Sequence, residues 1–213
     1  MRIGNLLIAV FFLTSLQAVA NIVAYTSSAD FEAAISGSPT LVEDYSTFAA
    51  GDLITPTVTY DGITYTNFNE ALGTEGLITN QFDSFSGLSL GAHQGNGDQY
   101  FFSGDTFDIR FAPVYAIGVF FNVNLNSGSF AISTPVGTAT TGSATYDTAT
   151  FVFAGLVSTT PFTSAEISSE NNGLASYNIP EIVLAQVPEP VTMSAMLGAG
   201  LLAALLLRRR LKA

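Results

Sequence analysis

Apolar and polar residues alternate through most of the middle of the chain. The longest alternation covers residues 116–125, and a second covers residues 106–111. A period of two places successive side chains on opposite faces of a β-strand. Pro113 is expected to end the earlier strand, because proline cannot donate to a sheet ladder. The composition, rich in Thr, Ser, Phe, Tyr and Val, also favours strands. Further short strands are predicted at residues 41–48, 76–79, 88–90, 100–102, 129–133, 138–141, 148–154, 162–168 and 176–184.

A tight hairpin is predicted at Asp61-Gly62. Asp-Gly supplies the positive φ angles of a two-residue type I′ turn, so the flanking residues pair in a fixed register. Residues on one face of this hairpin are expected to pack inward, namely Val58, Tyr60, Ile63 and Tyr65. Those on the other face are expected to be exposed or only partly covered, namely Thr57, Thr59, Thr64 and Thr66.

One short helix is predicted at residues 28–35, where capping residues precede Phe31, Ala34 and Ile35 on one face and Gly37 follows. Strands and helices do not alternate elsewhere, which argues against a parallel sheet. The predicted fold is all-β: a two-sheet antiparallel, jelly-roll-like sandwich with one short N-terminal helix. We expect it to span residues 21–186 as a single domain.

Residues 1–20 have the organisation of a secretory signal peptide. Arg2 precedes an apolar core at residues 6–16, and the small residues Ala18 and Ala20 stand where signal peptidase requires them, which predicts cleavage before Asn21. The signal helix would therefore be removed, and the Sec export machinery and signal peptidase are expected partners.

The C-terminal residues 187–213 have three parts in order: Pro188-Glu189-Pro190, an uncharged apolar run at 191–207, and Arg208-Arg209-Arg210. The run of 17 residues would rise about 25 Å as a helix, which just crosses a bilayer core. Arginines at its end favour the cytoplasmic side, so the body of the protein is expected outside. The sequence thus predicts a single transmembrane helix.

This tail resembles the PEP-CTERM sorting domain of Gram-negative bacteria, with the match at Pro188, Glu189, Pro190, Arg208, Arg209 and Arg210. The resemblance implies recognition by an exosortase, a membrane-embedded processing enzyme. It also implies sorting from the inner membrane to the cell surface or the exopolysaccharide matrix, where biofilm proteins act. The alternative is an ordinary single-span anchor that is not processed.

Charge and composition exclude several functions. Residues 21–186 contain sixteen acidic residues and one basic residue, Arg110, for a formal charge of −15. Such a surface repels phosphate backbones, so nucleic-acid binding is not expected. The chain has no cysteine, and His93 is its single histidine. Disulfides, thiolate chemistry and a zinc site of nitrogen and sulfur ligands are therefore excluded.

The order of motifs in the body also resembles a family of β-sandwich ectodomains that carry this tail. The motifs are Glu43-Asp44, the hairpin at residues 61–64, the strands at 107–111 and 116–118, and Pro-Phe-Thr-Ser at 161–164. The resemblance implies the sandwich fold. This chain departs from it at residues 177–180, where many relatives have an Asp-Asn pair.

Candidate chemistry is sparse. Gly87-Leu-Ser89-Leu-Gly91 matches a nucleophile elbow, but the flanking segments do not predict the strand and helix that this motif needs, so no catalytic residue is predicted. The best calcium candidate is the loop with Asn96, Asp98, Asp105 and Asp108. The alternative is that these residues serve only as turn formers. No other cofactor is expected.

Exposed aromatic residues could stack on sugar rings. The candidates are Tyr100, Tyr115, Phe120 and Tyr146, although most of the 17 phenylalanines must fill the core. We therefore predict an exported, non-enzymatic surface or matrix protein with a structural or adhesive role. A carbohydrate-binding module, with or without calcium, is the first alternative, and a secreted hydrolase is the second.

Overall fold

The computed structural model describes residues 21–69, 75–81, 84–93, 97, 99–124, 126–142, 144–146, 150–169 and 176–186. The predicted signal peptide, residues 1–20, and the predicted sorting tail, residues 187–213, lie outside the described residues. Within the described part, no helix is long and apolar enough to cross a membrane.

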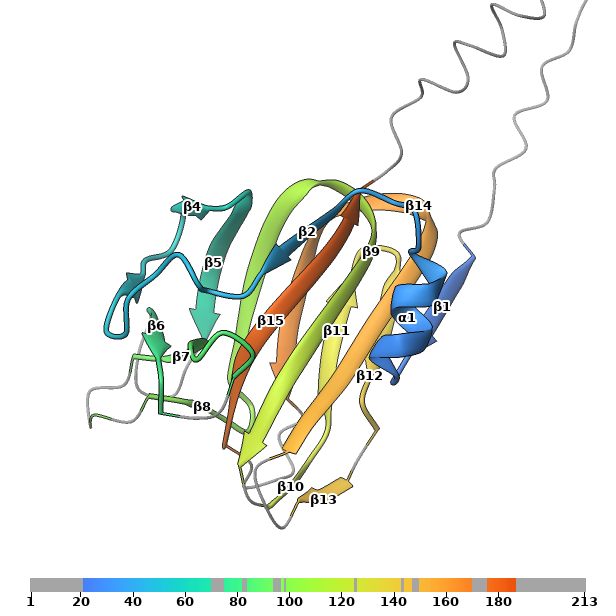
Figure 1. Ribbon diagram of the computed structural model, residues 1–213. Coiled ribbons are helices and arrows are strands. Elements are labelled where there is room, and N and C mark those ends of the chain that lie inside the picture. Colours follow the sequence, from blue (N-terminus) through green and yellow to red (C-terminus); the bar gives the residue numbers. More distant parts are fainter. Residues whose placement is uncertain are drawn as a thin grey trace, which may run out of the picture.

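Two long strands organise the body, β9 (Thr106–Asn124) and β14 (Thr150–Ser169). They pair antiparallel along nearly their whole lengths, and their register shifts between Val157 and Ser164 of β14. At this point both strands bend over one end of the molecule (Figure 1). We call this bend, residues 111–115 and 157–162, the arch. Because of the arch, each strand belongs to two layers.

The first sheet contains the early half of β9 and the late half of β14. Its strand order is β4 (Thr59–Tyr60), β5 (Ile63–Asn69), β9, β14, β11 (Phe130–Thr134) and β12 (Gly137–Thr140). All neighbours are antiparallel. The hairpin predicted at Asp61-Gly62 therefore forms one edge of this sheet.

The second sheet contains the other halves of β9 and β14, with β15 (Ser176–Gln186) beside β9 and β1 (Ile22–Tyr25) beside β14. Short strands pair with the far edge of β15: β2 (Thr40–Glu43), β7 (Ser89–Ala92) and β8 (Phe101–Phe102). The remaining strands are peripheral: β6 (Gly76–Thr79) pairs with β7, β3 (Leu53–Ile54) with β6, and β10 (Asn126–Gly128) with β13 (Ala144–Tyr146).

The two sheets face each other across one apolar core. Val119 and Phe121 of the second sheet are fully buried in the same cluster as Phe130, Ile132 and Ile167 of the first. The rings of Phe121 and Phe130 lie 4.9 Å apart between centroids. The all-β antiparallel sandwich is thus confirmed. The two sheets share the bent strands β9 and β14.

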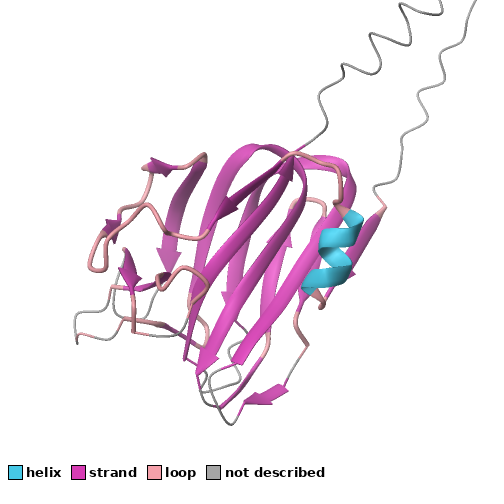
Figure 2. Ribbon diagram, viewed as in Figure 1, coloured by secondary structure: helices cyan, strands magenta, loops and turns pink. Residues whose placement is uncertain are grey.

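The one helix, α1 (Ser28–Ala34), covers part of the outer face of the second sheet (Figure 2). The Ser27 hydroxyl caps it by accepting a hydrogen bond from the Asp30 amide at 3.3 Å. Phe31 is buried against Phe153, with ring centroids 5.3 Å apart. The predicted helix is confirmed, except that Ala34 is exposed.

Glycine makes room for this contact. Gly118 and Gly155 lie opposite each other on β9 and β14. A Cβ on Gly118 would lie 2.9 Å from the Phe31 ring, and one on Gly155 would lie 2.7 Å from it. A side chain at either position would therefore clash with the rings of Phe31 and Phe153, and one or both rings would have to move.

The prediction that Pro113 ends a strand was wrong. Pro113 lies in the arch, between the paired residues Arg110 and Val114, where the register of β9 with β14 shifts. Its missing N–H therefore falls at an irregularity rather than in a regular ladder. For the same reason the strands predicted at 148–154 and 162–168 are one strand, β14.

The Asp-Gly turn is confirmed, with positive φ at Asp61 (44°) and Gly62 (86°), and Tyr60 pairs with Ile63. The inward position of Val58 was wrong. β4 begins only at Thr59, because Thr57 adopts φ 72°, and Val58 is 41% exposed. Thr66 was expected on an exposed face, but it is buried.

The strand predicted at residues 41–48 ends early, at Glu43. Tyr45 adopts φ 60°, in the left-handed region, so the extended conformation cannot continue through it.

Candidate functional site

Three phenylalanines gather on the outer face of the second sheet, beside α1. We call Phe85, Phe120 and Phe151 the aromatic patch. The Phe85 ring stacks on Phe151 and meets Phe120 edge-on, with both centroid separations 4.9 Å. Phe85 is 53% exposed and Phe151 is 40% exposed. These rings pack on one another while keeping large apolar surfaces in water.

Strand register places two of the three rings. Phe120 of β9 lies opposite Phe153 of β14. Phe151 lies two residues before Phe153, on the same face of β14. Phe153 is buried beneath, and its ring contacts both Phe120, at 4.9 Å, and Phe31 of α1. The aromatic patch is thus the uncovered end of an aromatic cluster whose other end lies under the helix.

Phe85 lies in a loop whose position is fixed by hydrogen bonds. The neighbouring Ser86 hydroxyl donates to the Asp44 carbonyl oxygen. The Ser86 hydroxyl oxygen also accepts a hydrogen bond from the Leu88 amide at 3.4 Å. The Asp44 carboxylate in turn accepts from the Ser46 amide at 3.0 Å, and hydrogen bonds from Ser46 hold the pKa of Asp44 below its usual value. These hydrogen bonds stabilise the loop that carries the Phe85 ring.

A hollow of about 460 Å³ opens beside the patch, a size within the range of small-ligand sites. Phe120, Phe151 and Phe153 form its apolar wall. The turn that leads into α1 also lines the hollow, and hydroxyl residues dominate there. The other lining residues are Thr26, Ser27, Ser28, Ala29, Thr141 and Val152. The hollow therefore combines ring faces with a hydroxyl rim.

A carboxyl group lies on the other side of the patch. Glu181 of β15 is the register partner of Phe120 on the same outer face. Its pKa is raised, first by burial and then by the negative charges of Asp44 and Glu32. A carboxyl with a raised pKa beside a carboxylate with a lowered pKa is also an arrangement that acid–base enzymes use.

The structure separates the predicted aromatic candidates. Phe120 belongs to the patch. Tyr115 lies at the arch, where its hydroxyl and that of Ser38 are hydrogen-bonded. Tyr100 packs edge-on against Phe102, with centroids 4.9 Å apart. The side chain of Tyr146 lies outside the described residues. Sequence reasoning missed Phe85 and Phe151.

Of the calcium candidates, Asn96 and Asp98 lie outside the described residues. Asp105 is buried, and its carboxylate accepts from the Phe102 amide at 2.7 Å, closing a tight turn. Asp108 lies on the outer face of the first sheet and accepts from Asn67 Nδ2 at 2.7 Å. No group of three or more metal-binding side chains occurs in the described ranges. Calcium binding here stays a prediction.

Ser89 and His93 are engaged separately. Ser89 is fully buried, and its hydroxyl accepts from Asn178 Nδ2 at 3.2 Å. His93 is half exposed, and its Nδ1 lies 3.5 Å from Glu75 Oε2. A serine needs a base within hydrogen-bond reach to act as a nucleophile. These contacts direct the two side chains to different partners.

A second unusual carboxyl group lies inside the sandwich. Glu43 is 2% exposed, and its Oε1 accepts from the Tyr45 amide at 2.8 Å. Tyr45 and Tyr65 are fully buried beside it, and their hydroxyls lie 3.5 Å apart. Burial raises the pKa of Glu43 to about 7, with smaller contributions from Asp61 and Asp44. Glu43 is sealed from solvent and cannot contact a ligand.

The residues predicted for sorting and for signal cleavage lie outside the described ranges, so export and sorting stay predictions. These residues are Ala18, Ala20, Pro188, Glu189, Pro190, Arg208, Arg209 and Arg210.

No protein-family model and no curated protein matches this sequence. Among solved structures, the chain is similar to a carbohydrate-binding module, CBM6cm-2, from Cellvibrio mixtus lichenase 5A, solved in complex with cellotriose. The identity is 12%, the TM-score is 0.31, and the match covers 66% of this chain and 100% of that one. A TM-score this low does not establish a shared fold, so the sandwich and its patch rest on the geometry described above.

Proposed function

We propose that this chain is an exported, non-catalytic protein of the cell surface or exopolysaccharide matrix, and that its sandwich binds polysaccharide at the aromatic patch. The observation that carries the proposal is the exposure of Phe85 and Phe151, 53% and 40%, in one stacked cluster beside a hollow. Clustered exposed apolar surface of this kind marks interaction sites in soluble domains.

The chemistry of the patch suits a sugar ring. The apolar C–H face of a pyranose can lie on an aromatic ring face, and phenylalanine offers such a face with few rotatable bonds. Thr26 and Ser28 on the rim of the hollow carry hydroxyl groups suited to hydrogen bonding with sugar hydroxyls. The formal charge of −15 on residues 21–186 disfavours anionic polymers. The expected ligand is therefore a neutral polysaccharide.

Export and sorting support the same location. The sequence of residues 1–20 predicts secretion, and the tail at residues 187–213 resembles a signal that sends proteins to a polysaccharide matrix. A glycan-binding sandwich would attach to the matrix polysaccharide without a covalent bond. An exosortase would be the processing partner, and the matrix polysaccharide the ligand.

The test is a glycan array probed with the full chain in detergent, followed by titration of the best neutral oligosaccharide. Phe151→Ala and Phe85→Ala should each weaken binding about tenfold or more, because each removes a stacking face. Val58→Ala is the matched control, since Val58 is 41% exposed but lies on the first sheet's hairpin. Absence of glycan binding, or equal losses in all three variants, would refute the proposal.

A hydrolase remains the competing function because of Glu181 and Asp44. Turnover assays on the bound oligosaccharide decide between the two. The proposal expects no cleavage products from the wild-type chain. Cleavage that Glu181→Gln abolishes would show an enzyme instead.

Sorting has its own test, the intact mass of protein recovered from the membrane and from the matrix of the native host. A matrix form that ends near Pro188 is expected. A form that keeps Ala213 and occurs only in the inner membrane would contradict processing.

A further inference from the structure

The described chain begins and ends at the same end of the sandwich, the arch. At the beginning, the Asn21 backbone nitrogen donates to Thr159 Oγ1 at 3.0 Å. At the end, Gln186 of β15 pairs with Val114, and its amide donates to the Pro39 carbonyl at 2.8 Å. In Figure 1, the start of β1 and the end of β15 both lie toward the end of the molecule where β9 and β14 bend.

The segments around these two ends are free of charge. Residues 21–25, 36–41, 111–116 and 157–163 contain no Asp, Glu, Lys, Arg or His. The sixteen acidic residues of the body all lie in other segments. One acidic residue lies nearby by strand register, because the Asp61-Gly62 turn directly precedes Ile63, which pairs with Phe111. The segments of the arch and of the two described ends carry no fixed negative charge themselves.

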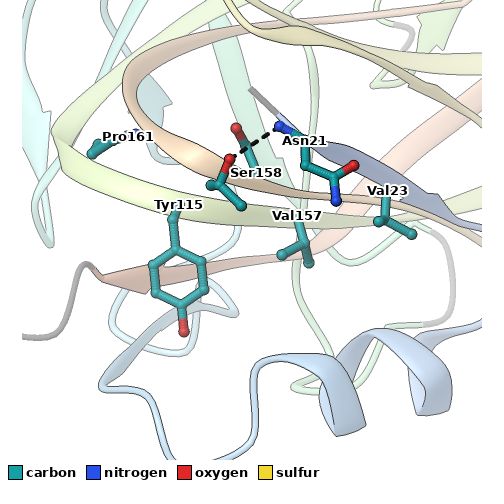
Figure 3. Close-up of a pocket in the computed structure, with 7 residues that line it drawn as sticks. Asn21, Val23, Tyr115, Val157, Ser158 and Pro161 are labelled. Atoms are coloured by element: carbon teal, nitrogen blue, oxygen red, sulfur yellow. Dashed lines mark hydrogen bonds between the residues drawn. The ribbon is translucent and has the colours of Figure 1, made fainter. Parts of the chain in front are cut away.

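The same end has an apolar hollow of about 450 Å³ (Figure 3). Tyr115, Val157 and Val23 supply its apolar wall, and Val23 is 45% exposed although it lies in a strand. Pro161, Ser158, Thr159 and Asn21 complete the lining. Figure 3 shows Tyr115 and Val157 pointing to the same side of the strands. Aliphatic, tyrosine and hydroxyl side chains together suit the boundary between lipid and water.

The tail limits how far the arch can be from a membrane. Four residues, 187–190, separate Gln186 from the apolar run that begins at Val191. Fully extended, this connection spans at most about 18 Å. Once the run is in a bilayer, the end of β15 cannot move farther than this from the bilayer surface.

We propose that the arch docks on the phospholipid surface while the tail is in the membrane, with Val23 and Tyr115 at the headgroup level. This inference rests on the membrane-inserted tail of the proposed function. Cleavage before Asn21 would add one positive group to the hollow, the new amino terminus, which suits a lipid phosphate. Phe151 is six residues from Val157 along β14, about 20 Å, so docking leaves the aromatic patch open.

The absence of cysteine allows a direct test with single-cysteine probes. Val23→Cys carries an environment-sensitive fluorophore at the arch, and exposed Pro161→Cys is a second arch position. Thr140→Cys is the control, because Thr140 is exposed and lies toward the far end of the first sheet. The full chain, produced without the processing enzyme, is reconstituted into phosphatidylcholine vesicles with a headgroup-level nitroxide lipid.

Docking predicts several-fold stronger nitroxide quenching at positions 23 and 161 than at position 140. Equal, weak quenching at all three positions, in protein that floats with the vesicles, would overturn the docking and leave the anchor intact. Protein that does not float would overturn the anchor and the docking together. Glycan binding by the same samples reports separately on the aromatic patch.

Discussion

The two outer faces of the sandwich are built from the same two long strands and yet differ in chemistry. On the first sheet, the outward positions of β9 and β14 are polar: Asp108 and Arg110 lie opposite Glu166 and Ser164. On the second sheet, the outward positions of the same strands include Phe120, Phe151, Phe153 and the glycine pair. The outward residues change from polar to apolar along β9 as it crosses the arch, and from apolar to polar along β14.

The difference follows from what covers each face. On the second sheet, α1 covers Gly118, Gly155 and Phe153. The two glycines leave space for the Phe31 ring, which packs against Phe153. The helix has only seven residues and stops short of Phe151. An apolar surface larger than its cover is the physical origin of the aromatic patch. The polar first sheet needs no cover.

The largest expected effect comes from removing the helix contact. Phe31→Ala should lower the free energy of unfolding by about 3–5 kcal/mol, the usual cost of deleting a buried phenylalanine. Urea denaturation measures it. Glu32→Ala, the exposed neighbour on α1, should change stability by no more than about 0.5 kcal/mol. Equal effects of the two variants would mean that the helix does not depend on this face.

The core between the faces should exclude charge, and Glu43 tests this. Its pKa is raised from 4.5 to about 7, so the folded state holds the proton more tightly than the unfolded state. The contribution of Glu43 to the free energy of unfolding is therefore full below pH 4.5. As the pH rises to about 7, the protein loses about 3 kcal/mol of this free energy.

Glu43→Gln should remove this component of the pH dependence, because the amide keeps an acceptor for the Tyr45 amide and does not ionise. Unfolding curves from pH 4 to pH 8 compare the two proteins. Parallel curves for wild type and variant would show that Glu43 ionises in the fold at its ordinary pKa.

Gly155→Ala should cost about 1–3 kcal/mol, because the new methyl group would overlap the rings of Phe31 and Phe153. Ser164→Ala is the control on the same strand, on the outer face of the first sheet, and should stay within about 0.5 kcal/mol. Thermal unfolding distinguishes them. A neutral Gly155→Ala would show that the helix can shift without loss.

The smallest expected stability effect is at the patch itself. Phe151→Ala should cost about 1–2 kcal/mol, less than Phe31→Ala, since the residue is 40% exposed and keeps much of its area in water after folding. Denaturant midpoints measure this. A cost as large as that of Phe31→Ala would make the patch part of the core rather than a binding surface.

Regular alternation made most of the strands predictable. The inward positions Ile117, Val119, Phe121 and Val123 are all fully buried, as the period of two requires. The arch was not predictable, because Pro113 signals the end of a strand locally and the bend depends on two strands acting together. The edge strand β1 was also missed, because it has only four residues beside the signal peptide.

The aromatic patch could be predicted only in part. Phe120 stood out as a large apolar residue at an outward position of a regular strand. Residues 151–154 are all apolar, so no alternation shows which of their side chains point outward, and the outward direction of Phe151 could not be read from the sequence. Phe85 lies in a serine- and glycine-rich stretch, and tertiary contacts alone bring it to the other two rings.

The most direct test of the central claim is fluorine NMR of the chain labelled with fluorophenylalanine, recorded during titration with a neutral oligosaccharide of the matrix. Binding at the aromatic patch predicts that the resonances of Phe85, Phe120 and Phe151 move with one common dissociation constant. Those of the core residues Phe107 and Phe130 should stay fixed. Saturable binding that leaves the three patch resonances unmoved would contradict the claim.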